Sequence, residues 1–61
     1  MMYSVTFLNS ASFFCSNIAI GNIEDIKKHY EEEGYTVISI KEATEGEFMT
    51  AQRKGMPIVK V

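Results

Sequence analysis

The N-terminal third of the chain alternates apolar and polar side chains as a β-hairpin does. Residues 3–8 read Tyr-Ser-Val-Thr-Phe-Leu, and the period of two at their start predicts a half-buried strand. Residues 9–12 are mostly small and polar, as in a hairpin loop. Residues 13–20 are aromatic or β-branched at both ends and predict the second strand. Because Ser16 and Asn17 interrupt its apolar pattern, we expect a bulge there.

The next segment has the spacing of an amphipathic helix. Its apolar stripe, at intervals of three and four residues, consists of Ile23, Ile26 and Tyr30. Asn22 can cap the first turn through its side-chain oxygen. Gly34 can adopt the left-handed conformation that ends a helix. We therefore predict a helix from Ile23 to Gly34, followed by a β-branched strand over residues 36–41.

Residues 45–54 carry the signals of a second helix. Thr44 and Glu47 have the spacing of a capping box, and the sequence Gly-Met-Pro after the segment is typical of a helix end. A short strand over residues 58–61 follows. In the alternative interpretation, which the sequence leaves open, residues 47–61 form a hairpin instead.

The predicted order of elements is β-β-α-β-α-β, which is an α+β pattern. We expect a small single domain over residues 1–61, with one sheet covered by two helices on one face. Right-handed crossovers make the second and third strands parallel, with the first strand between them and antiparallel to both. The domain has two parts, an uncharged β-hairpin over residues 1–20 and a helix-strand-helix-strand segment over residues 22–61.

Charge and composition narrow the possible partners. All charged side chains lie between Glu24 and Lys60, and the formal net charge is -2. This balance gives no general attraction to phosphate backbones, so it disfavours nucleic acid as a partner. One cysteine and one histidine can form neither an intrachain disulfide nor a four-ligand zinc site, and we expect no metal and no cofactor.

The sequence shows no targeting or membrane segment. No stretch approaches the roughly 20 apolar residues that cross a bilayer, and the N-terminus lacks the basic start of a signal peptide. We therefore expect a cytoplasmic protein with no membrane partner, in which Cys15 stays reduced.

Two residues are candidates for catalysis. His29 lies four residues after Asp25 and could act as an oriented general base, and Cys15 could act as a nucleophile. The sequence places no nucleophile beside His29, so we favour a surface role for this residue. It places no cationic neighbour beside Cys15, so we favour a packing role for the thiol. The prediction is a non-catalytic domain with no small-molecule substrate, because so short a chain has little room for an enclosed pocket.

The uncharged hairpin is the strongest candidate for a protein interface. Open strands in natural proteins normally carry charged side chains, especially Lys, and this hairpin has none. Whichever face of the second strand is buried, one of its two adjacent phenylalanines is exposed on the other face. We predict an accessory or inhibitor-like interaction domain that binds a protein partner or forms a homodimer. The interface residues would be Tyr3, Val5, Phe13, Phe14 and Cys15, and the sequence leaves open which face they expose.

A second hypothesis uses the cationic side chains of the C-terminal half. They are Lys41, Arg53, Lys54 and Lys60. If they lined one edge of the domain, they could contact the phosphates of a nucleic acid. The competing interpretation, which we favour, is that Arg53 and Lys54 complement the dipole of the second helix.

Overall fold

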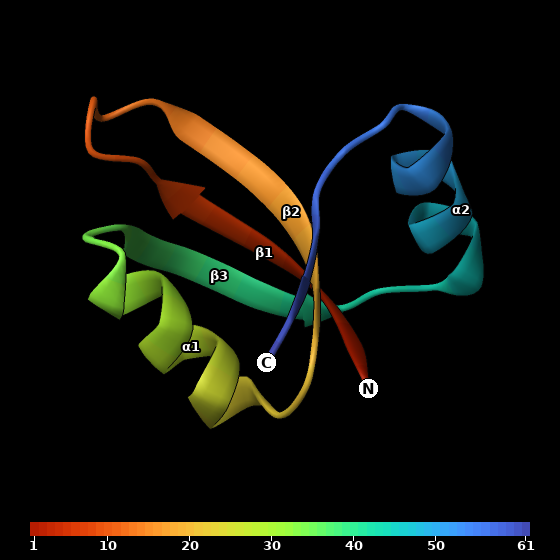
Figure 1. Ribbon diagram of the computed structural model, residues 1–61, viewed down its shortest axis with the longest axis horizontal. Helices are drawn as coiled ribbons and strands as arrows, with labels where there is room; N and C mark the ends of the chain where they lie inside the picture. The colour runs from red at the N-terminus through yellow and green to blue at the C-terminus, as the bar shows by residue number, and fades with distance from the viewer.

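A four-stranded sheet runs through the centre of the molecule, and the computed structural model describes residues 1–61 (Figure 1). The strands are β1 (Met2–Leu8), β2 (Phe14–Ile20), β3 (Thr36–Glu42) and β4 (Ile58–Lys60), and the helices are α1 (Ile23–Glu32) and α2 (Glu45–Arg53). The order along the chain is β-β-α-β-α-β, which confirms the predicted α+β class.

The strands lie in the order β3-β1-β2-β4. β1 is antiparallel to both of its neighbours, as predicted, and β4 is parallel to β2. The bulge predicted at Ser16 and Asn17 is wrong, because the pairing of β1 with β2 is unbroken there. The register shift lies between β1 and β3, at Thr6 and Phe7. Ser16 and Asn17 interrupt the apolar pattern without changing the register of β2.

The main core lies between α1 and one face of the sheet. Its buried side chains are Tyr3, Val5, Phe7, Ala19, Ile26 and Tyr30. Val5 and Ile26 have no exposed surface. The Phe7 ring packs against Tyr30 and Tyr35, with ring centroids 4.8 and 4.9 Å away. Every second residue of β1 is therefore apolar and buried beneath α1.

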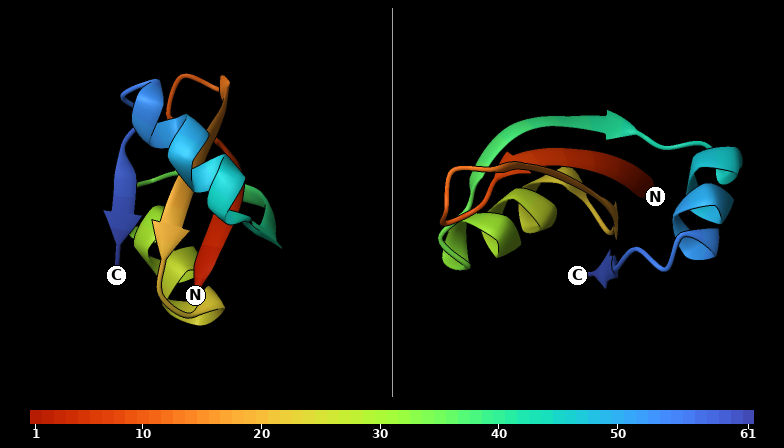
Figure 2. Two further views of the ribbon diagram at one scale, coloured as in Figure 1. Left: turned by 90° about the vertical axis from the view of Figure 1, so that its right-hand side faces the viewer. Right: turned by 90° about the horizontal axis from the view of Figure 1, so that it is seen from above.

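α2 lies on the other face of the sheet, which corrects the expectation that both helices cover one face. The register places Ile18 opposite Ser4, on the face away from α1, and Ile18 is buried there. α2 contacts β2 and buries its own Ala51. Figure 2 shows the two helices on opposite sides of the twisted sheet. The crossovers from β2 to β3 and from β3 to β4 run in opposite directions, so two right-handed crossovers require opposite faces.

α1 begins at the predicted residue, Ile23, and its last helical residue is Glu32, two positions before the predicted end at Gly34. The Asn22 side chain accepts a hydrogen bond from the Asp25 N–H at 2.8 Å. After the last turn, the Tyr35 N–H donates to the Tyr30 carbonyl at 3.0 Å, while Gly34 adopts φ +86°. This is the Schellman motif, in which a residue with positive φ reverses the chain.

α2 forms in place of the alternative hairpin over residues 47–61. Thr44 and Glu47 make both hydrogen bonds of the capping box. At the other end, the N–H groups of Gly55 and Met56 donate to carbonyls of the last turn, as in the motif that ends α1. Local capping chemistry therefore identified this helix correctly.

Candidate functional site

The turn between β1 and β2 is held by Asn9. Its side-chain oxygen accepts hydrogen bonds from the N–H groups of Ala11 and Phe13, at 2.9 and 3.0 Å. Its backbone N–H donates to the Phe13 carbonyl at 3.0 Å, and Ser12 adopts φ +63°. The turn thus has a defined shape that places Phe13 directly before β2.

Two adjacent aromatic side chains are exposed beside this turn. Phe13 is 68% exposed and Phe14 is 74% exposed. Phe14 pairs with Leu8 in the register, so it lies on the face that α1 does not cover. The sequence predicted one exposed phenylalanine, and the structure exposes both.

The structure separates the five residues of the predicted interface. Tyr3 and Val5 are buried beneath α1, at 7% and 0% exposure, so their side chains are not available to a partner. Cys15 is half-buried and packs against the core. Phe13 and Phe14 remain at the surface. We call residues 13–17 the hairpin end, and this segment is the candidate site.

The hairpin end also has an open hydrogen-bonding edge. β4 pairs only with Ile18–Ile20, so residues 14–17 of β2 have no strand on their outer side (Figure 1). No charged residue, proline or register shift occurs in this stretch. Such features normally keep an open edge from pairing with another chain, and this edge lacks them.

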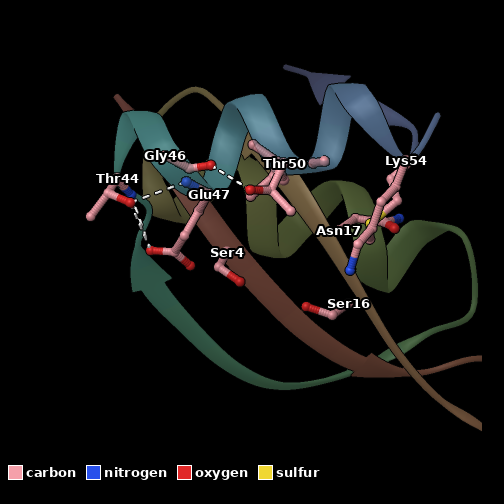
Figure 3. Close-up of a pocket in the computed structure, with 11 residues that line it drawn as sticks. Ser4, Ser16, Asn17, Thr44, Gly46, Glu47, Thr50 and Lys54 are labelled. Carbon is pink, nitrogen blue, oxygen red and sulfur yellow. Dashed lines mark hydrogen bonds between the residues drawn. The ribbon is translucent and has the colours of Figure 1, made fainter.

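A groove of about 510 Å³ lies between α2 and the sheet (Figure 3). Ser4 and Ser16 line its sheet side, and Lys54 lies beside Asn17 at one end. The Thr50 hydroxyl in its wall donates to the backbone of α2 itself. The groove is open to solvent and is not an enclosed pocket. No sequence pattern indicates this groove, because it exists only when α2 covers this face of the sheet.

The cationic side chains of the second hypothesis do not line one edge. Lys41 on β3 and Lys60 on β4 lie at opposite edges of the sheet, with β1 and β2 between them. Arg53 lies in the last turn of α2, and Lys54 is its C-cap. These two positions let positive charge meet the negative end of the helix dipole. The four side chains do not form one continuous phosphate-binding surface.

The candidate catalytic residues make other contacts. The Asp25 carboxylate accepts a hydrogen bond from the Asn22 amide at 2.8 Å, and the His29 ring packs edge-on against Tyr30. The Cys15 thiol lies 3.5 Å from the Asn9 amide nitrogen and 3.7 Å from the Phe13 carbonyl. The side chains of Asp25 and His29 are therefore not brought together as an acid–base pair.

The structure was also compared with the requirements of metal sites and membrane-spanning helices, and with other proteins. No group of three or more His, Cys, Asp or Glu side chains is placed to hold a metal ion. Neither helix has the length and apolar content needed to cross a bilayer. No protein family, curated protein or solved structure matches the chain. The candidate site therefore depends on its geometry alone.

The Tyr30 hydroxyl is buried without a hydrogen-bond partner of acceptable geometry. Burial raises the pKa of Tyr30. The nearby Asn17 side chain lowers this pKa in part, and the neighbouring Tyr35 raises it further. An unpaired buried hydroxyl costs about 1–3 kcal/mol. We expect Tyr30→Phe to raise the free energy of unfolding by about 1 kcal/mol in a urea titration at neutral pH.

The raised pKa of Tyr30 also sets the sign of a pH dependence. Above about pH 10 the unfolded chain loses the Tyr30 proton before the folded chain does. The wild type should therefore lose stability as the pH rises through this region, and Tyr30→Phe should lose less. A variant that is less stable at neutral pH, or that follows the same alkaline profile, would refute this account of the hydroxyl.

Proposed function

We propose that the chain is a small, non-catalytic protein-interaction domain of the accessory or inhibitor kind, which binds through its hairpin end. The observation that carries the proposal is the pair Phe13 and Phe14, which are 68% and 74% exposed in an uncharged segment. Exposed apolar patches on small proteins mark interaction sites, and aromatic side chains contribute much of the binding energy once buried.

A second copy of the chain is the partner that we propose first. The net charge of -2 repels copies in general, but the hairpin carries no charge of its own. Only 8 of the 61 residues are buried, so the domain has little core. Association would add the apolar burial that a chain of this size lacks. A homodimer with two-fold symmetry uses the same surface from each copy.

The proposal places the protein in the cytoplasm, where Cys15 stays a thiol. It does not extend to nucleic acid, because Lys41 and Lys60 lie at opposite edges of the sheet. A titration with DNA or RNA that showed tight, strongly salt-dependent binding would favour the second hypothesis over this one.

Phe14→Lys should weaken self-association at least tenfold, because it places a charge in the proposed contact. The measurement is sedimentation equilibrium over a series of protein concentrations. Met49→Lys is the matched control, since Met49 is also apolar and 58% exposed but lies on α2. It should leave the dissociation constant unchanged. A wild type that stays monomeric throughout, or equal effects of the two substitutions, would contradict the proposal.

A further inference from the structure

We propose that two copies of the chain pair as antiparallel strands through the open edge of β2, with the two Cys15 residues opposite each other at the two-fold axis. The inference rests on the proposed function and adds the geometry of the contact. It would join the two sheets into one continuous sheet.

The backbone N–H and C=O groups along β2 point alternately toward β1 and away from it. The Asn9 N–H donates to the Phe13 carbonyl, and the Gly21 N–H donates to the Met1 carbonyl. Odd-numbered residues of β2 therefore direct their backbone groups toward β1. Hydrogen bonding alternates along an antiparallel strand, so even-numbered residues direct theirs outward. The Val61 N–H, on the outer side, accordingly donates to the carbonyl of Ile20.

Only some of the outward backbone groups of β2 are free to pair with another chain. β4 uses the outer edge of Ile18–Ile20. The N–H and C=O groups of Phe14 and Ser16 are the outward groups that remain. This edge therefore presents two donors and two acceptors in alternation, and two such edges in antiparallel orientation are complementary to each other.

The limits of the open stretch of β2 determine the register in which two copies can pair. The chain turns away at Ser12, and β4 begins beside Ile18, so residues 13–17 are free to pair. The midpoint of this stretch is Cys15. A two-fold axis at Cys15 places Phe14 opposite Ser16 of the second copy and allows four backbone hydrogen bonds. The free backbone groups of Phe14 and Ser16 are also symmetric about Cys15. The length of the open stretch and the positions of its hydrogen-bonding groups therefore select the same register.

The side chains support this register. Phe14 and Phe14 of the second copy lie diagonally across the pair, on the face that α1 leaves open. Diagonal neighbours are about 7–8 Å apart between their α-carbons, which is within reach of two aromatic rings. Two exposed rings would therefore cover each other at the centre of the dimer. Ser16, also on this face, has no charge that would oppose the contact.

The other open edges of the sheet are less suited to pairing. β3 has the register shift opposite Thr6 and Phe7, and it carries Lys41 and Glu42. β4 has three residues and ends at Lys60. Bulges, charges and short length are the devices by which natural proteins prevent edge pairing. The residues of the hairpin end itself have no charge, bulge or proline, and Lys54, the C-cap of α2, lies beside Asn17 at one end of the stretch.

Cys15 supplies a direct test of the register. In this arrangement the two Cys15 residues form a non-hydrogen-bonded pair with α-carbons about 4.5 Å apart. That separation lies within the roughly 4.4–6.8 Å spanned by disulfides. Oxidation with diamide, which takes up the two hydrogens released as the thiols join, should give a covalent dimer of the wild type. The control is the double substitution Cys15→Ser, Ser10→Cys, which moves the thiol to the exposed turn.

We expect the wild type to cross-link at least tenfold faster than the control at a concentration where sedimentation shows a dimer. Adding Phe14→Lys to the wild type should reduce the rate to that of the control. If the dimer forms and Phe14→Lys disrupts it, but Cys15 links no faster than the control, edge pairing is wrong and the proposed interface stands. If the wild type is monomeric at every concentration, both proposals fail.

Discussion

Replacing Ile26 with Ala should lower the free energy of unfolding by about 3 kcal/mol. Ile26 has no exposed surface and packs from α1 into the core cluster on the sheet, where the loss of its side chain would leave a cavity. A domain of 61 residues has a total stability of about 3–9 kcal/mol at ~0.05–0.15 kcal/mol per residue. The variant should therefore unfold at a much lower urea concentration, or be partly unfolded in buffer.

The same helix offers a matched control for this substitution. Ile23 is 47% exposed, although the sequence placed it on the same apolar stripe as Ile26. Ile23→Ala should change the free energy of unfolding by about 0.5 kcal/mol or less. If the two alanine variants were equally destabilised, the packing of α1 against the sheet would differ from that described.

Gly21→Ala should destabilise the fold by about 2 kcal/mol or more. Gly21 adopts φ +147°, a conformation that costs other residues about 1–3 kcal/mol. A β-carbon there would also lie 2.5 Å from Val61 Cγ2 and 3.0 Å from the Val61 carbonyl oxygen. The substitution therefore combines backbone strain with a clash against Val61, the residue directly after β4. Thermal unfolding followed by circular dichroism would measure the loss.

A double substitution separates the two causes. Val61→Ala removes the γ-carbon that the new β-carbon would meet, so Gly21→Ala should cost less in that background than in the wild type. The remaining loss reports the strain at φ +147°. A Gly21→Ala protein as stable as the wild type would show that neither the close approach nor the backbone conformation constrains this position.

The elements of the fold could be predicted because their signals are local. Asn22 and Thr44 cap the helices through bonds to residues three positions away, and Gly34 ends α1 through its own conformation. The side of the sheet that α2 covers could not be predicted in the same way. The side that α2 covers depends on β4 pairing with β2. The sequence of a strand of only three residues does not indicate which strand it pairs with.

The candidate site could be predicted in part. The alternation of faces in the sequence predicts that one of Phe13 and Phe14 is exposed, whereas the structure exposes both, with Phe13 lying before the first residue of β2. Tyr3 and Val5 were assigned to the interface wrongly, because the same alternation buries them beneath α1. The extent of the open edge could not be predicted, since it depends on β4 beginning to pair with β2 at Ile18.

Hydrogen exchange of the Phe14 and Ser16 backbone amides, followed by NMR at high and low protein concentration, tests the edge-pairing proposal most directly. We predict slow exchange at high concentration and fast exchange after dilution, because these two amides bond only to the second copy. Ile40, whose amide faces outward on the open edge of β3, should exchange fast at both concentrations. Fast exchange of Phe14 and Ser16 at every concentration, or protection of Ile40 instead, would contradict the account.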